Sequence, residues 1–128
     1  MRPDTPYSPR ERAAVSQVRE AVVWASETLE FSHQEVGQAL GGASPRTVAR
    51  WRGGEQRPHP PAVLAAEALL GLSQALDAVF PGDPDRMHAW LHEPVPGLGH
   101  RTPLRAIVEG EAREVLTLLA NVDAGTFI

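Results

Sequence analysis

Apolar residues recur every three or four positions over most of the chain, which is the period of a helix with one buried face. The clearest early stripe consists of Val15, Val18, Val22, Ala25 and Leu29. A second stripe, near the end of the chain, consists of Ala112, Val115, Leu116, Leu119 and Val122. We therefore predict an all-α fold of about seven helices, over residues 9–29, 33–40, 45–52, 61–80, 84–91, 103–109 and 111–122.

The predicted helices begin at residues that can cap a helix. Ser8 precedes Pro9 and is followed by Glu11, and Ser32 is followed by Glu35. Each Ser–Glu pair can form a capping box, in which the hydroxyl and the carboxylate both accept backbone N–H groups. Proline suits the first helical position because its missing N–H would have no partner there. These local signals place the helix starts.

The predicted helix over residues 61–80 is apolar around most of its circumference, so it lies either in the centre of a core or at an interface. The sequence before it, Arg-Pro-His-Pro-Pro at 57–61, predicts a stiff linker, because proline fixes the backbone and removes a donor. We therefore divide the chain into an N-terminal subdomain, residues 1–60, and a C-terminal subdomain, residues 61–128.

The composition favours helices and permits a reducing compartment. The 128 residues suffice for one compact domain or two helical subdomains that share a core; 42% are hydrophobic and only 5% aromatic. The chain has no cysteine, which excludes disulfides and thiolate chemistry. The first residues lack a signal-peptide core, and no stretch comes near the roughly 20 apolar residues that span a bilayer. We expect a cytoplasmic protein without a membrane partner.

The net charge of −4 by itself argues against a nucleic-acid binder, but the charge is unevenly distributed. Residues 1–60 carry a net charge of +1 and residues 61–128 a net charge of −5. Within residues 46–57 there are four arginines and a single acidic residue. A local basic cluster on an acidic protein indicates a specific surface more clearly than the total charge does.

Residues 32–52 have the layout of a helix-turn-helix, with a small residue, Gly37, where the two helices would cross. In such a unit the start of the second helix meets base edges in the major groove. Arginine can bond bidentately to guanine, threonine can contact the thymine methyl, and a capped helix start suits a phosphate. The predicted DNA-contacting residues are Ser44, Arg46, Thr47, Arg50, Arg52 and Arg57.

This segment resembles the helix-turn-helix of the Xre (phage repressor-like) family. The resemblance lies in Gln34-Glu35-Val36-Gly37, Leu40-Gly41, Thr47-Val48-Ala49-Arg50-Trp51-Arg52-Gly53 and Pro58. The sequence departs from the family in its turn, residues 41–44, which is one residue longer than usual. An ordinary helical hairpin with a solvated arginine face remains the alternative.

The most distinctive segment spans residues 90–104. Pro94 and Pro96 stiffen it, Gly97 and Gly99 permit tight backbone geometry, and a Thr-Pro pair starts the next helix. A loop that is shaped in advance loses little conformational entropy when it binds. We therefore predict that this loop binds a partner.

The region from about residue 72 to the end is similar to the toxin-binding domain of Xre, MbcA and ParS-type antitoxins. The matching residues are Trp90-Leu91, Pro94, Leu98-Gly99, Thr102-Pro103, Gly110, Val115, Leu118-Leu119 and Gly125. The resemblance implies a partner toxin with a RES domain, which consumes NAD or uses it for ADP-ribosylation, and whose active-site cleft the antitoxin covers. It also implies repression of the protein's own operon, and a homodimer within a toxin–antitoxin hetero-oligomer.

The residues expected to bind the toxin come from this loop and from the apolar end of the chain. They are Trp90, Pro94, Leu98, Gly99, His100, Arg101, Thr102, Pro103, Thr126, Phe127 and Ile128. The last three follow a helix-ending glycine, and a partner pocket would shelter them from water. Packing of this tip onto its own domain is the alternative.

Catalytic readings find little support, so we predict no enzyme, metal or cofactor. His88 and His92 have a spacing that zinc can use, but no third ligand accompanies them. Glu109, Glu111 and Glu114 flank a predicted helix start, where the helix dipole favours acids. Three non-enzymatic functions remain open: an antitoxin that also represses transcription, a DNA-binding regulator with no toxin, and an antitoxin whose N-terminal half only dimerises.

Overall fold

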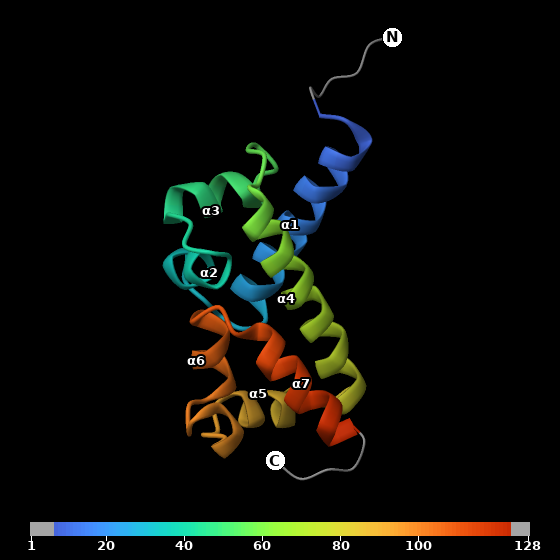
Figure 1. Ribbon diagram of the computed structural model, residues 1–128. Helices are drawn as coiled ribbons and strands as arrows, with labels where there is room; N and C mark the ends of the chain where they lie inside the picture. Colours follow the sequence, from blue (N-terminus) through green and yellow to red (C-terminus); the bar gives the residue numbers. More distant parts are fainter. Residues whose placement is uncertain (1–6, 124–128) are drawn as a thin grey trace.

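The computed structural model describes residues 7–123, and within them the prediction of an all-α fold with seven α-helices is confirmed. The helices are α1 (Pro9–Glu27), α2 (His33–Ala39), α3 (Pro45–Arg52), α4 (Pro60–Val79), α5 (Pro84–Leu91), α6 (Pro103–Val108) and α7 (Ala112–Asp123) (Figure 1). A short 3-10 helix, η1 (Pro96–Leu98), was not predicted and lies in the loop before α6.

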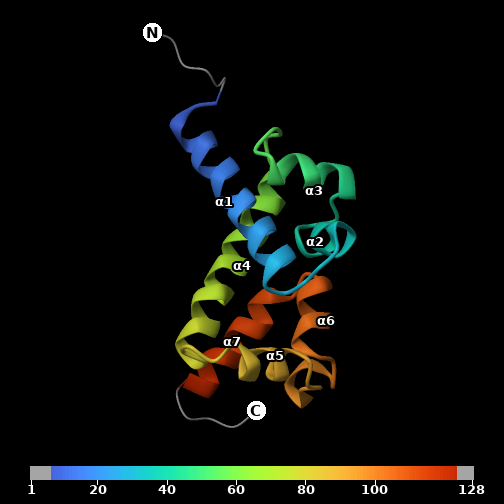
Figure 2. The same ribbon diagram turned by 180° about the vertical axis from the view of Figure 1, so that it is seen from behind.

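The long helix α4 is the centre of the structure. Its most extensive contacts are with α7 and α1 (Figures 1 and 2). The pair α2 and α3 packs against α1 in the upper half of the molecule, whereas α5, η1 and α6 lie at the lower end, and α2 contacts α6. One hydrophobic cluster runs from Val18 of α1 and Trp51 of α3 through Leu72 of α4 to Leu119 of α7. The two predicted subdomains therefore share a core.

The predicted capping boxes are confirmed. The Ser8 hydroxyl accepts the Glu11 N–H at 3.2 Å, and the Glu11 carboxylate accepts the Ser8 N–H at 2.9 Å. The pair Ser32 and Glu35 makes the same two bonds at 3.1 and 2.9 Å. Each box satisfies two backbone donors that the first helical turn leaves without partners.

The predicted linker at 57–61 is wrong at its end, because α4 already begins at Pro60. His59 is the N-cap, and its Nδ1 atom accepts the N–H of Ala62 at 3.1 Å. An imidazole nitrogen thus replaces the serine or aspartate oxygen that usually caps a helix. The two prolines then occupy helical positions where no N–H is needed.

Contrary to the sequence-based expectation, α4 is long and apolar enough to cross a membrane by length and composition. Its 20 residues include only two charged ones, Glu67 and Asp77. A core helix passes the same test, and here five residues on α4 are fully buried: Ala62, Ala66, Leu69, Leu72 and Leu76. They belong to the cluster that joins α1, α4 and α7.

Gly37 lies at the close approach that the sequence predicted. The N–H groups of Gly42 and Ala43 both donate to its carbonyl oxygen, at 2.8 and 2.9 Å. A Cβ atom at position 37 would lie 2.0 Å from the Ala43 carbonyl oxygen and 3.4 Å from a methyl group of Val48. The turn between α2 and α3 therefore closes only over a residue without a side chain.

The substitution Gly37→Ala should lower the free energy of unfolding by about 1–3 kcal/mol, because the added methyl group forces the turn backbone to shift. Urea denaturation monitored by circular dichroism measures the change. The matched control is Gly71→Ala in α4, where the new Cβ would have its nearest neighbour, a methyl of Leu116, at an ordinary 3.7 Å. There alanine should stabilise by about 0.5–1 kcal/mol, because it costs less backbone entropy than glycine. Equal effects of the two substitutions would contradict this account of the turn.

Candidate functional site

The loop between α5 and α6 is a closed hairpin. The Val95 N–H donates to the Arg101 carbonyl at 3.0 Å, and the His100 N–H donates to the Val95 carbonyl at 3.0 Å. Between these bonds η1 makes one tight turn, and Leu98, only 3% exposed, points into the core. The loop that the sequence predicted to be stiff therefore has a defined backbone and an apolar anchor. We call residues 94–101 the hairpin.

The tip of the hairpin contains two consecutive left-handed residues. Gly99 has a φ of +67° and His100 a φ of +66°. Glycine adopts this conformation without strain, whereas for a residue with a side chain it is uncommon and costs energy. Both residues are exposed, and the surrounding hydrogen bonds hold His100 in this conformation.

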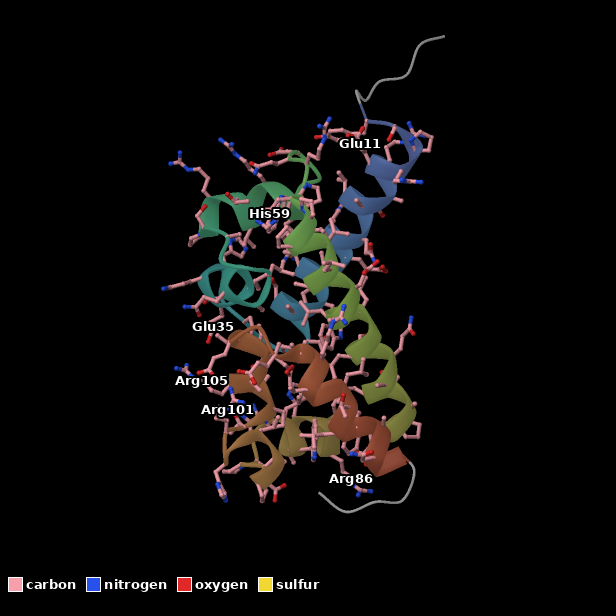
Figure 3. All side chains as sticks on the ribbon, in the orientation of Figure 1. Glu11, Glu35, His59, Arg86, Arg101 and Arg105 are labelled. Atoms are coloured by element: carbon pink, nitrogen blue, oxygen red, sulfur yellow. The ribbon has the colours of Figure 1, made fainter. Side chains whose placement is uncertain are left out.

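Arg101 ties the hairpin to the connection between α6 and α7. Its Nε donates to the Leu98 carbonyl at 2.7 Å, and its Nη1 donates to Glu109 Oε1 at 2.6 Å. Nη1 and Nη2 also donate to the two carboxylate oxygens of Glu111, each at 2.8 Å. Glu109 in turn accepts from Nε of Arg105 at 2.9 Å. Figure 3 shows Arg101 and Arg105 close together beside α6.

These bonds stabilise the charged forms of both partners. Hydrogen bonds from Arg101 hold the pKa of the Glu111 carboxyl below its ordinary value. Hydrogen bonds to Glu111 and Glu109 raise the pKa of Arg101. From the sequence, the two glutamates were expected only to interact with a helix dipole. Arg101 lies eight and ten positions before them, and no local pattern predicts that it bonds to either.

Trp90 is half-buried at the end of α5. Its ring packs against that of Phe80, with 6.2 Å between the ring centroids. Phe80 was not predicted as part of this site. It is the C-cap residue of α4 and comes near α5 because the chain turns back between the two helices. Together they form an aromatic pair beside the buried Leu91.

The remaining predicted contacts divide between surface and interior. Pro94 is exposed, Thr102 caps α6 by accepting the Arg105 N–H at 3.1 Å, and Pro103 is buried. Leu98 and Pro103 therefore shape the hairpin from inside. The predicted contacts Thr126, Phe127 and Ile128 lie outside the described residues.

The predicted recognition helix is α3. Its N-cap Ser44 accepts the Thr47 N–H at 3.1 Å and donates to the Thr47 hydroxyl at 3.0 Å. As predicted, Val48 and Trp51 are buried. Arg46 and Arg50 are exposed on the opposite side; among the described residues Arg46 makes no ion pair or side-chain hydrogen bond.

The other two predicted phosphate contacts are engaged in surface ion pairs. Arg52 meets Glu27 at 3.0 Å, and Arg57 meets Glu11 at 3.2 Å while its guanidinium lies 5.3 Å from the centre of the Tyr7 ring. Exposed pairs of this kind contribute about 0–1 kcal/mol, so a phosphate can compete with them.

Comparison with known proteins relates both surfaces to one family. Residues 75–125 match the family model of the antitoxin Xre/MbcA/ParS C-terminal toxin-binding domain. Over 115 residues the chain is 33% identical to the mycobacterial cidal antitoxin MbcA of Mycobacterium bovis and of Mycobacterium tuberculosis. This alignment covers 89% of the chain and 98% of MbcA. The chain belongs to the Xre/MbcA/ParS antitoxin family.

A solved structure extends the similarity to the fold. A chain in the crystal structure of the M. tuberculosis MbcT–MbcA toxin–antitoxin complex superposes with a TM-score of 0.61 and 32% identity. The superposition covers 87% of this chain and 97% of that one. The family model itself covers the end of α4, α5, the hairpin, α6 and α7, so the hairpin and the Arg101 bonds lie in the matched domain.

The described part of the chain contains no candidate metal-binding cluster. Among residues 7–123, no group of three or more histidine, cysteine or acidic residues could hold a metal ion. His88 lies in the last turn of α5, and His92 is the C-cap residue of that helix.

The free energy of unfolding should fall at acidic pH, in part because Glu111 becomes protonated. Because Arg101 stabilises its carboxylate only in the folded chain, this contribution is present above the ordinary pKa of 4.5. It is lost as the pH falls through the lower folded pKa. Urea unfolding over a pH series should therefore give a flatter acid slope for Glu111→Gln than for the parent chain. Glu114→Gln, in the first turn of α7, removes a carboxylate that takes no part in the Arg101 bonds and is the matched control. Identical slopes for the parent and Glu111→Gln would exclude this contribution.

Proposed function

We propose that this chain is the antitoxin of a toxin–antitoxin pair and neutralises a toxin with a RES domain by covering its active site. Such a toxin consumes NAD or uses it to ADP-ribosylate a target. The observation that carries the proposal is the 33% identity to MbcA over 98% of that protein, which is an antitoxin. The similar fold in the MbcT–MbcA complex supports a toxin as the partner.

The hairpin offers a suitable docking surface. Pro94, Gly99 and His100 are exposed on a backbone that internal hydrogen bonds already hold in place. A surface ordered in advance loses less entropy on binding than a flexible loop. We propose that these residues and Trp90 contact the toxin, that Leu98, Thr102 and Pro103 support them from behind, and that residues 126–128 enter the toxin's cleft. In this proposal the chain acts in the cytoplasm, by binding alone and without a cofactor.

We infer a second activity, repression of the antitoxin's own operon through α3. The exposed Arg46 and Arg50, with Thr47 between them, suit base edges, while Ser44, Arg52 and Arg57 suit the phosphate backbone. A transcriptional regulator with no toxin is the second candidate function, favoured by the same arginine face. Co-purification with the protein encoded by the neighbouring gene separates the two.

A homodimer would let two α3 helices meet successive major grooves. A groove of about 720 Å³ between α4, α7 and the turn after α2 supports self-association. Its apolar lining includes Leu64, which at 55% is the most exposed large apolar side chain of the described residues. We propose that the N-terminal half both dimerises and binds DNA.

The toxin hypothesis predicts that His100→Asp weakens binding of the neighbouring gene's toxin by at least about tenfold, since it places a new charge at the centre of a docking surface. Aspartate tolerates the left-handed backbone at this position, so the fold should persist. Calorimetric titration measures the affinity, and rescue of growth on co-expression measures neutralisation. Gln74→Glu on the exposed face of α4 introduces the same charge elsewhere and should bind like the parent. No association between the parent chain and that toxin would sink the proposal.

The DNA hypothesis predicts that Arg46→Ala and Arg50→Ala each cost about 1–3 kcal/mol of binding to the operon's own promoter fragment, with relaxed sequence preference. Arg57→Ala should instead weaken binding to all sequences and reduce the salt slope by about one, as expected of a phosphate contact. Gel-shift titration at several salt concentrations distinguishes the two. Arg86→Ala on α5, at the opposite end of the molecule from α3 (Figure 3), is the control and should bind normally; if it weakens binding as much as Arg46→Ala, α3 is not the recognition helix.

A further inference from the structure

We propose that Arg101 is a positioning residue, which does not bind the toxin itself but braces the hairpin in the conformation that the toxin recognises. This inference rests on the proposed antitoxin function, and it reverses the sequence-based assignment of Arg101 as a contact. It also gives Glu111 and Glu109 a part in toxin binding, although neither lies in the hairpin.

The guanidinium of Arg101 is already occupied. An arginine has five N–H donors, and Arg101 directs four of them to the Leu98 carbonyl, to both oxygens of Glu111 and to Glu109. Its side chain is only 31% exposed. A toxin carboxylate could form a bidentate pair with Arg101, the strongest type of arginine pair, only by displacing one of these partners.

The same bonds join two segments that the backbone does not hold together. One segment is the hairpin, which contributes Arg101 and the carbonyl group of Leu98. The other is the connection between α6 and α7, which contributes the carboxylates of Glu109 and Glu111. Glu109 extends the set to Arg105 of α6, four positions before it. Four charges in one network are held more rigidly than an isolated surface pair, which is often worth nothing measurable.

The tip next to Arg101 needs such support. His100, directly before Arg101, has a φ of +66°, a conformation that a side-chain-bearing residue leaves readily when its surroundings loosen. Without the brace the tip would sample several conformations, and the toxin would have to select one of them. The apparent affinity falls by the fraction of molecules that are in the competent conformation.

The decisive comparison is between Arg101 and the residue that holds it. A contact residue and a brace both lose affinity when Arg101 is replaced. They differ for Glu111→Gln, which frees the guanidinium: a contact would then bind the toxin as well as before or better, whereas a brace would bind it less well. The double variant also distinguishes a contact from a brace. If Arg101 and Glu111 act through their mutual bonds, replacing both residues should weaken toxin binding no more than replacing either one.

The experiment uses the full chain and the toxin encoded by the neighbouring gene. We expect Arg101→Gln, Glu111→Gln and the double variant each to weaken binding by about tenfold, with no additional loss in the double variant. Arg10→Gln and Arg19→Gln, exposed on α1 and outside the Arg101 network, are matched controls that should bind like the parent. Parent-like or tighter binding by Glu111→Gln, or additive losses in the double variant, would overturn the brace.

A measurement on the free chain keeps this inference separate from the proposed function. The Val95 and His100 amides are hydrogen-bonded within the hairpin, so their hydrogen exchange reports its opening. Exchange of these two amides should be at least about tenfold faster in Arg101→Gln and Glu111→Gln than in the two controls, while core amides of α4 exchange unchanged. Unchanged exchange at both amides refutes the brace even if the toxin binds. If the parent chain does not bind the toxin at all, the antitoxin proposal fails instead.

Discussion

The burial of α4 is the interaction on which the rest of the structure depends. Leu69, Leu72 and Leu76 are almost completely removed from water, and each contributes roughly 1.5–3 kcal/mol relative to an exposed side chain. The helices that cover them, α1 and α7, come from opposite ends of the described chain. Neither end can therefore form its native packing alone, although each carries a different candidate surface.

This shared core places the two candidate surfaces on one rigid body. The proposed recognition helix α3 is anchored by Trp51, which is 1% exposed, and the hairpin is anchored by Leu98. Between them α2, which precedes the recognition helix, contacts α6, which follows the hairpin. A partner bound to the hairpin would therefore contact the same packed core that carries α3.

The hairpin illustrates how rigidity is divided between local and distant interactions. Its prolines and its backbone bonds restrict it locally, and Leu98 anchors it by burial. The ion network of Arg101 adds a restraint from outside the loop, and this restraint depends on the ionisation of Glu111. The family relationship identifies the domain, but only the hydrogen-bond geometry shows that one of its expected contact residues is directed inward.

Structural features that depend on residues close together in the chain were predictable without the fold. Serine and glutamate three positions apart bond to the same helical turn, so both capping boxes were predictable, as were the seven helices to within two residues at each end and the small residue at Gly37. The tertiary structure decided what depends on residues brought together by folding. The pairing of Phe80 with Trp90, the capping of α4 by His59 and the bonds of Arg101 to Glu109 and Glu111 arise from the path of the chain. Local spacing carries no information about such partners, because it is the burial of α4 that brings them within reach.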